Sequence, residues 1–107
     1  KYDNMTFDEL IDNITQWADD KGILVSENVP QQTMKVMEEL GETAGAILKQ
    51  KKTEDVIDGI GDILVTVIIL SKQLGLEPTE CLESAWNEIK DRKGKTIDGT
   101  FIKEEEL

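Results

Sequence analysis

An apolar run, Ile63–Leu70, follows directly after Asp62 and limits the folds that this chain can adopt. Its β-branched residues suit a buried strand, but the apolar pattern continues to Leu74 and ends at Gly75, a typical helix stop, so we interpret it as a helix. The run is shorter than the about 20 apolar residues that cross a bilayer. A helix that is apolar on nearly every side should be buried on every side. Since 107 residues offer few helices to cover it, we expect a subunit interface here.

Two acidic clusters lie on what the sequence predicts as neighbouring helices. Residues three or four apart share a helix face, so Glu39 pairs with Glu42 and Asp58 pairs with Asp62. If the helices are antiparallel, the two pairs meet, and such crowded carboxylates need a cation, a proton or a basic partner. Oxygen ligands without His or Cys favour magnesium or manganese. The alternative is that these acids coat solvated faces of an acidic protein.

Glycines accompany both clusters, at Gly41, Gly45, Gly59 and Gly61. Each costs a helix roughly 1 kcal/mol relative to Ala, yet it lets two backbones approach closely. An interpretation as helix stops is weaker, because helix-forming or apolar residues continue on both sides. We therefore expect the glycines to bring the two acidic helices together.

The pattern of apolar residues, caps and breakers predicts four helices in a single domain, residues 1–107. Thr6 with Glu9 forms a start signal, and Pro30 suits a first helical turn. The expected helices are about Thr6–Lys21, Pro30 to near Lys52, Thr53–Leu74 and Pro78–Ile89. After them, Thr96–Lys103 resembles an extended hairpin with Asp98-Gly99 as the turn, and Glu104–Glu106 is expected to be a mobile tail. The predicted fold class is all-α, a four-helix bundle with a short C-terminal extended tail, assembled as a homo-oligomer.

The net charge of −11 argues against a nucleic-acid backbone or an anionic membrane as a general partner, because like charges oppose the encounter. The single Cys81 cannot form an internal disulfide, so a reducing cytoplasm is the expected compartment. The chain has no His, which excludes a Cys/His nucleophilic site.

One dense basic stretch, Lys90–Lys95, follows the fourth helix. A solvated helix terminus is one interpretation of it, and phosphate binding beside a metal site is the other. The aromatic side chains leave a similar choice. Trp17 and Trp86 lie on amphipathic helices, where packing in the core competes with stacking on a base.

Gln32–Glu42 and Asp58–Asp62 resemble the MazG-type all-α nucleoside triphosphate pyrophosphohydrolases, and the resemblance covers roughly residues 5–103. That family carries ExxE on one helix and ExxD on the next. The first motif matches Glu39-Leu40-Gly41-Glu42, whereas Gly59 stands where the second has Glu, and Asp58 is the available substitute. Two C-terminal segments, Trp86–Lys95 and Gly99–Lys103, are similar to those of compact MazG-like proteins of phages and Gram-positive bacteria. They are also similar to segments of the related dimeric dUTPases.

The resemblance implies hydrolysis of a nucleoside triphosphate between its α and β phosphates, with Mg²⁺ or Mn²⁺, by a homodimer or dimer of dimers. The implied metal ligands are Glu39, Glu42, Asp58 and Asp62. Glu38 and Glu39 are the catalytic candidates, Glu38 by orienting or deprotonating a water molecule. Lys35 and Arg92 rank first as phosphate ligands, although Lys35 can instead pair with Glu38 or Glu39 on its own helix. The full substrate-binding set is Trp17, Lys35, Asn87, Arg92, Lys93, Lys95 and Lys103.

Two alternatives stay open. If Gly59 records the loss of a catalytic ligand, the chain is a non-catalytic helical dimer that binds nucleotides or a protein partner. If the chain is an enzyme of a related kind, its substrate is dUTP, dCTP or phosphoribosyl-ATP. Measurements of metal binding and turnover distinguish the enzyme from the non-catalytic dimer. A substrate panel distinguishes the possible substrates of the enzyme.

Overall fold

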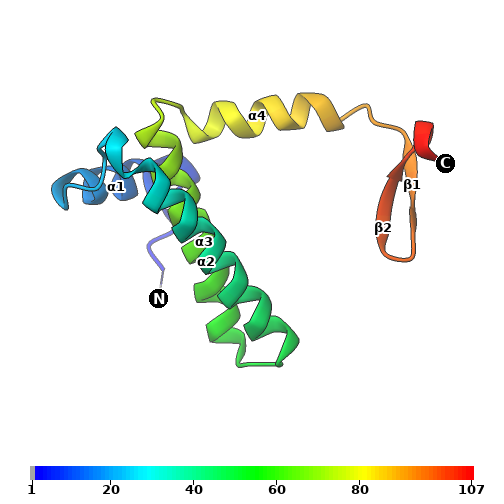
Figure 1. The fold of residues 1–107 in the computed structure, drawn as a ribbon, viewed down its shortest axis with the longest axis horizontal. Coiled ribbons are helices and arrows are strands. Elements are labelled where there is room, and N and C mark those ends of the chain that lie inside the picture. Colours follow the sequence, from blue (N-terminus) through cyan, green and yellow to red (C-terminus); the bar gives the residue numbers. More distant parts are fainter. Residues whose placement is uncertain (1) are drawn as a thin grey trace.

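The computed structural model describes residues 2–107, so Lys1 of the predicted domain lies outside the described residues. The elements in chain order are α1 (Phe7–Asp20), a 3-10 turn (Ser26–Asn28), α2 (Val29–Leu48), α3 (Thr53–Gln73), α4 (Pro78–Ile89), β1 (Gly94–Ile97), β2 (Thr100–Lys103) and a 3-10 turn (Glu104–Glu106) (Figure 1). The predicted helical class with a C-terminal extended segment is confirmed, and the apolar run is helical as expected.

The start of α1 is fixed by a reciprocal cap. The Thr6 hydroxyl oxygen accepts a hydrogen bond from the Glu9 backbone N–H at 3.1 Å, and the Glu9 carboxylate accepts one from the Thr6 backbone N–H at 3.1 Å. These bonds satisfy two donors that a helix start otherwise leaves free. They also hold the pKa of Glu9 below its ordinary value, chiefly through the Thr6 backbone bond. The predicted helix start is therefore confirmed.

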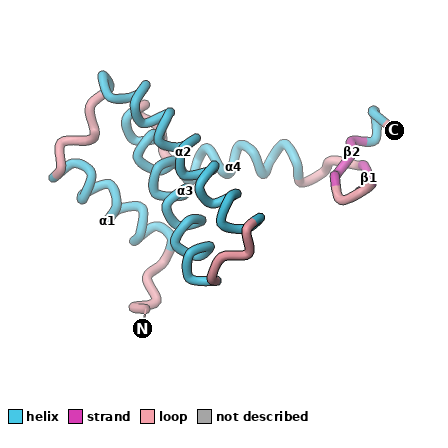
Figure 2. Tube along the Cα trace, turned by 60° about the horizontal axis from the view of Figure 1, so that its bottom comes forward, coloured by secondary structure: helices cyan, strands magenta, loops and turns pink. Residues whose placement is uncertain are grey.

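Helices α2 and α3 form an antiparallel pair, side by side in both views and joined by residues 49–52 (Figures 1 and 2). The Gln32 side-chain amide on α2 donates to the Thr66 carbonyl oxygen on α3 at 3.1 Å. Near the middle of the pair, the buried Thr43 hydroxyl donates to the Glu39 carbonyl oxygen of its own helix at 2.8 Å. The predicted antiparallel arrangement of the two acidic helices is therefore present.

Gly59 brings the two helices together. A Cβ on Gly59 would lie 2.5 Å from Thr43 Oγ1, so only a glycine fits there without a shift of Thr43. The same expectation is wrong for Gly41, Gly45 and Gly61, where an added Cβ would meet nothing within 4 Å. Those three glycines face open space, so packing within the chain does not require them.

The buried apolar core is small, and its members are Ile11, Ala18, Ile68 and Ile69. The expectation that the apolar run of α3 is buried on every side is wrong for the single chain, because Leu64 is 46% exposed and Val67 is 40% exposed. Helices α1, α2 and α4 each contact α3, but they leave part of its apolar surface uncovered within residues 2–107. Leu64 and Val67 belong to that surface and line an apolar hollow with Phe7 of α1 and Leu82 of α4.

Helix α4 does not complete a four-helix bundle within one chain. It leaves α3 at a bend of 104° and leads the β hairpin away from α2 and α3 (Figures 1 and 2). The radius of gyration is 16.5 Å, whereas a compact domain of this length has about 13 Å. The bundle prediction fails because a sequence pattern shows which face of a helix is apolar and not which chain covers it.

The C-terminal hairpin has the predicted turn. Strands β1 and β2 pair antiparallel with Gly94 opposite Lys103, and both turn residues have positive φ, 51° at Asp98 and 81° at Gly99. These angles suit the tight turns that match strand twist. The tail that was expected to be mobile continues as the 3-10 turn after β2, where the Glu104 backbone N–H donates to the Lys93 carbonyl oxygen at 2.8 Å.

Residues 2–107 contain no single helix that is both long and apolar enough to span a membrane; α3 and α4 pass that test of length and composition only as a bent pair.

Candidate functional site

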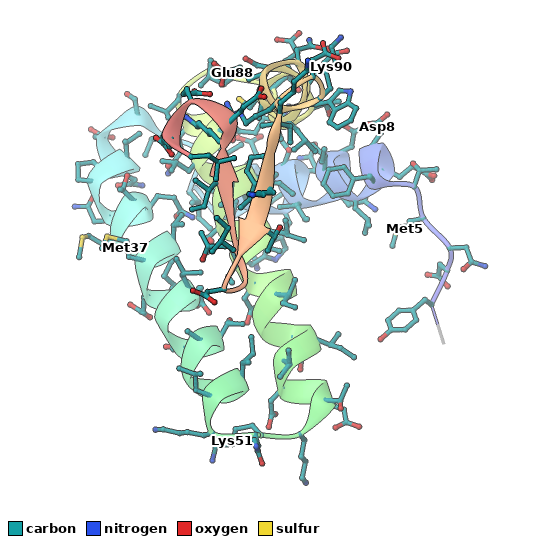
Figure 3. All side chains as sticks on the ribbon, turned by 90° about the vertical axis from the view of Figure 1, so that its right-hand side faces the viewer. Met5, Asp8, Met37, Lys51, Glu88 and Lys90 are labelled. Atoms are coloured by element: carbon teal, nitrogen blue, oxygen red, sulfur yellow. The ribbon has the colours of Figure 1, made fainter. Side chains whose placement is uncertain are left out.

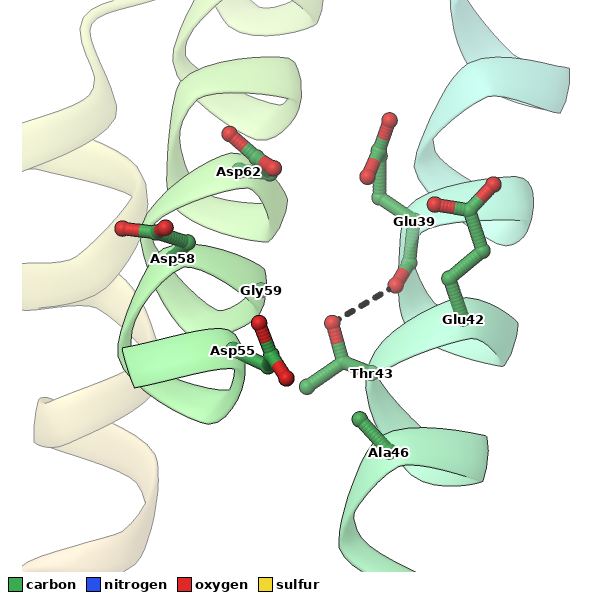
Figure 4. Close-up of a pocket in the computed structure, with 8 residues that line it drawn as sticks. All are labelled: Glu39, Glu42, Thr43, Ala46, Asp55, Asp58, Gly59 and Asp62. Carbon is green, nitrogen blue, oxygen red and sulfur yellow. Dashed lines mark hydrogen bonds between the residues drawn. The ribbon is translucent and has the colours of Figure 1, made fainter. Parts of the chain in front are cut away.

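A small cavity of about 150 Å³ opens between α2 and α3 next to Gly59 (Figure 4). Five carboxylates line it, and we call them the acidic groove: Glu39 and Glu42 from α2 and Asp55, Asp58 and Asp62 from α3. Thr43, Ala46 and Gly59 complete the lining. The structure thus brings the four carboxylates that the sequence singled out to one place.

Asp55 is the member of the groove that sequence reasoning missed. The sequence analysis assigns no role to it. Its spacing carried the signal, because Asp55, Asp58 and Asp62 follow one another at three and four residues and so share one face of α3. Asp55 stands one helical turn before Gly59, the position without a side chain.

The carboxylates face one another across the seam without closing on a common point. Glu39 and Asp62 point toward each other in Figure 4, while the Asp58 carboxylate is directed away from α2. Across residues 2–107, no three His, Cys, Asp or Glu side chains are grouped tightly enough to hold a metal ion as they stand. Binding of a shared cation would therefore require the acidic side chains to rotate toward it.

The surroundings of Glu39 disfavour its charged form. Glu39 is half-buried, and its pKa is raised first by loss of hydration and then by the nearby carboxylates of Glu42 and Asp62. Lys35 acts in the opposite direction and lowers the Glu39 pKa. The net increase means that the charged form of Glu39 lacks sufficient compensation by a cation.

Lys35 is engaged by its own helix. Its Nζ lies 3.3 Å from Glu38 Oε1, and this bond with the Glu38 charge raises the Lys35 pKa. Both side chains are about half exposed, so the pair contributes little to stability. Glu38 is consequently paired with Lys35 and does not line the acidic groove.

A second cavity, of about 260 Å³, shares Glu39 and Asp62 with the acidic groove. Trp17 of α1, Gln32 and Lys35 contribute to it, together with Ile23, Val65, Thr66 and Ile69. We call it the tryptophan pocket. Trp17 is 51% exposed, so the alternative in which it packs in the core is wrong for the single chain. The structure places an aromatic face and an ammonium group beside the acids.

A third, more open hollow of about 570 Å³ continues from the opposite end of the groove. It shares Glu42, Ala46 and Asp55 with the groove and adds Gly41, Gly45, Lys49 and Lys51. The sequence analysis assigns no role to these two lysines. The three hollows therefore form a continuous surface from Trp17 to Lys51.

The remaining predicted substrate ligands lie elsewhere. Asn87 is on α4, and Arg92, Lys93, Lys95 and Lys103 are on or next to the hairpin. None of them lines the three hollows. Figure 3 places Lys90 at the opposite end of the molecule from Lys51, and Figure 1 shows the hairpin far from the α2–α3 pair. Within one chain, these cations and the acidic groove are separate.

Neither a protein-family model nor a solved structure matches the chain. Among curated proteins, it is similar to the uncharacterized 18.2 kDa protein in the rep-hol intergenic region of Haemophilus phage HP1, with 49% identity over 67 residues. The match covers 61% of this chain and 39% of the phage protein, so the chain spans well under half of that relative. The relative carries no described activity.

Proposed function

We propose that the chain is a MazG-type pyrophosphohydrolase, which cleaves a nucleoside triphosphate between the α and β phosphates with the help of magnesium. The products would be a nucleoside monophosphate and pyrophosphate. The acidic groove carries the proposal, because five carboxylates from two helices line one small cavity. Few arrangements other than a divalent-cation site make such a concentration of like charge useful.

The donor chemistry of the groove fits magnesium. All five side chains are carboxylates, and hard oxygen ligands without nitrogen or sulfur suit magnesium or manganese. All except Glu39 are exposed, so they are free to rotate toward an ion. The raised pKa of Glu39 also supports the fit, since a cation would offset both causes of the increase, the loss of hydration first and then the repulsion from Glu42 and Asp62. Bound magnesium would neutralise phosphate charge and lower the pKa of a water molecule.

We propose that Asp55 compensates for Gly59, which stands where the second motif of the family has Glu. Gly59 has no side chain, and Thr43 occupies the space that a longer residue would need. Asp55 and Asp58, on the same face of α3, can supply the oxygen ligands that Gly59 cannot. We therefore assign cation binding to Glu39, Glu42, Asp55, Asp58 and Asp62.

Glu39 is the better placed of the two predicted catalytic carboxylates. It lines both the acidic groove and the tryptophan pocket, whereas Glu38 is bound to Lys35 outside the groove. A carboxylate whose pKa is raised accepts a proton more readily than an ordinary one. Glu39 would therefore both bind the cation and orient the attacking water.

The three connected hollows suggest the direction in which the substrate lies. Trp17 offers a flat aromatic face on which any base can stack, with Lys35 beside it. The phosphates would extend from there past Glu39 and Asp62 into the groove, toward Lys49 and Lys51. In this arrangement the scissile bond lies over the carboxylates.

The uncovered apolar faces support a homodimer or a dimer of dimers. Residues at alternating three- and four-residue spacing form one stripe on α2 and another on α3: Met37, Leu40, Ala44 and Ile47, and Ile57, Ile60, Leu64 and Val67. All eight are exposed, and Met37 points outward from α2 in Figure 3. Such spacing forms the contact seam of helical bundles. We propose that these stripes meet those of a second copy.

The proposal is tested by pyrophosphate release from canonical and modified nucleoside and deoxynucleoside triphosphates, with phosphoribosyl-ATP included, in magnesium or manganese. Glu39→Gln and Asp62→Asn should each lower turnover by at least about 100-fold. Glu54→Gln is the matched control, because Glu54 is on α3 beside Asp55 but outside the groove, and it should remain active. Absence of turnover with every substrate, in a folded oligomer, would favour the non-catalytic binding dimer instead.

A further inference from the structure

The arm, which we define as α4 and the hairpin (residues 78–103), carries cations that have no partner within the chain. The ion pairs formed by residues 2–107 are Lys35–Glu38 and Lys72–Glu77. Arg92, Lys93 and Lys95 are therefore free of salt bridges in the single chain, although the protein carries a net charge of −11. The stretch Lys90–Lys95 holds four cations against one carboxylate, Asp91, and this local positive charge will be attracted to acidic surface on another copy.

The arm also has an uncovered apolar face. Leu82, Trp86 and Ile89 follow one another at four and three residues on one side of α4, and each is about half exposed or more. Where α4 leaves α3, an apolar hollow of about 300 Å³ stays open between Leu64, Val67 and Leu82. Apolar area of this kind is stabilised by burial, and the single chain provides no surface that covers it.

The cations are held by an ordered element. The hairpin has a fixed register and a tight turn at Asp98-Gly99. Gly94 has no room for a side chain, because a Cβ there would collide with the Ile102 carbonyl oxygen and the Phe101 ring. Lys93 and Lys95 therefore flank a position where the two strands pack tightly, and the hairpin presents them in a defined arrangement.

The acidic groove lacks the groups that the arm carries. Its lining contains five carboxylates and no cation. Lys35 is bound to Glu38, and Lys49 and Lys51 line the adjoining hollow and not the groove itself. A triphosphate brings further negative charge, which basic side chains usually bind alongside the metal ion. The arm cannot supply them to its own groove, because the bend after α3 leads it away.

We infer that the arm of one protomer lies along a second copy and brings Arg92, Lys93 and Lys95 to the acidic groove of that copy, so that each phosphate-binding site is built from two chains. The role in phosphate binding rests on the proposed function, whereas the contact between arm and groove does not. The second copy is the occupant that charge complementarity selects: the lining of the acidic groove contains no cation, and the stretch Lys90–Lys95 on the same chain carries four cations and one carboxylate, Asp91.

Cross-linking tests the contact without any need for activity. In a Cys81→Ser background, Asp55→Cys is prepared on a chain with a large tag and Lys95→Cys on an untagged chain, and the two are refolded together. A short bifunctional maleimide should give a covalent dimer of the tagged and untagged chains. A chain with both cysteines should give the linked dimer and no internally linked monomer. Internal linkage, a protein that sediments as a monomer, or a dimer without the mixed cross-link would overturn the inference.

Complementation tests the shared site. Asp62→Asn removes a groove ligand, and Arg92→Ala/Lys95→Ala removes the arm cations, so each protein alone should be nearly inactive. In a two-fold dimer, half of the randomly mixed molecules contain one intact site, so the mixture should recover about one quarter of wild-type turnover. No recovery would show that groove and arm act within one chain. If the wild type has no turnover, the proposed function fails, and the cross-link alone decides the inference.

Discussion

Gly59 and Thr43 contact each other so tightly that a Cβ on Gly59 would lie 2.5 Å from Thr43 Oγ1. Thr43 is held in place, because its hydroxyl donates to the Glu39 carbonyl oxygen at 2.8 Å and only 4% of the residue is exposed. This contact lies in the lining of the acidic groove. It therefore fixes the separation of the two helices whose carboxylates face each other.

Gly59→Ala should destabilise the protein by about 1–2 kcal/mol. Overpacking against Thr43 costs about 1–3 kcal/mol, and the better helix propensity of Ala returns up to about 1 kcal/mol. Urea unfolding followed by circular dichroism measures the difference. Gly61→Ala is the matched control, because a Cβ there meets nothing within 4 Å, and it should raise stability by up to about 1 kcal/mol. Equal effects of the two substitutions would show that the Thr43 contact is unimportant.

A double-mutant cycle isolates that contact. Thr43→Ala removes both the hydroxyl and the methyl group that approach Gly59. Gly59→Ala should therefore cost less in the Thr43→Ala background than in the wild type, since the new methyl group has room. If the two effects simply add, the loss at Gly59 has a cause other than steric contact.

Asp55→Asn should weaken magnesium binding by at least about 10-fold, as should Asp62→Asn, because each removes one charged oxygen ligand. Isothermal titration without nucleotide measures the affinity directly. Glu54→Gln changes the neighbouring residue, which lies outside the groove, and should leave affinity within about two-fold. If Asp55→Asn binds magnesium as tightly as the wild type, Asp55 is not a ligand, and Asp58 is the substitute for the missing Glu.

Stability should depend on pH through Glu39. Its pKa is raised in the folded protein, so the Glu39 carboxylate binds a proton more tightly in the folded protein than in the unfolded chain. The contribution of Glu39 to stability is therefore fully present below its ordinary pKa of 4.5 and is lost as the pH rises through the raised value. Without metal, Glu39→Gln should gain stability relative to wild type between acid and neutral pH, by thermal unfolding. A constant difference across that range would contradict the assigned repulsion.

Magnesium should reduce the advantage in thermal stability that Glu39→Gln has over the wild type without metal. An ion that binds the folded protein stabilises it by about 2.7 kcal/mol at 100 times its dissociation constant. The wild type should therefore gain more thermal stability from magnesium at neutral pH than Glu39→Gln does. Identical increases in the two proteins would place the ion outside the acidic groove.

Nucleotide binding should be reported by Trp17 and not by Trp86. The chain has two tryptophans, and only Trp17 lies in the pocket that shares Glu39 and Asp62 with the groove. Fluorescence quenching by a nucleotide with calcium in place of magnesium should persist in Trp86→Phe and disappear in Trp17→Phe. Quenching that follows Trp86 would move the base to the arm.

Local patterns predicted much of the fold. The Thr6–Glu9 cap, the Asp98-Gly99 turn and the ends of the helices depend on neighbouring residues, and the structure contains them. The C-terminus of α2 was placed a few residues too late, since Leu48 ends it before the lysines. The angle between α3 and α4 depends on packing between distant surfaces, and no local pattern contains it.

In the candidate site too, local spacing was informative and contacts between distant residues were not predictable. Helical spacing placed Glu39, Glu42, Asp58 and Asp62 together, and the same spacing could have found Asp55. Glycines were less informative, because a sequence does not show which of them packs closely against the neighbouring helix; in the α2–α3 pair only Gly59 does so, against the Thr43 side chain. The positions of Arg92 and Lys95 follow from the bend of 104° between α3 and α4, which no local sequence pattern predicts.

The central claim is tested most directly by a ³¹P nuclear magnetic resonance time course of one nucleoside triphosphate incubated with the protein and magnesium. The account predicts that monophosphate and pyrophosphate signals grow in equal amounts, stop growing when the metal is chelated, and are absent with Glu39→Gln. Formation of a nucleoside diphosphate and orthophosphate, or turnover that survives chelation and the loss of Glu39, would contradict it.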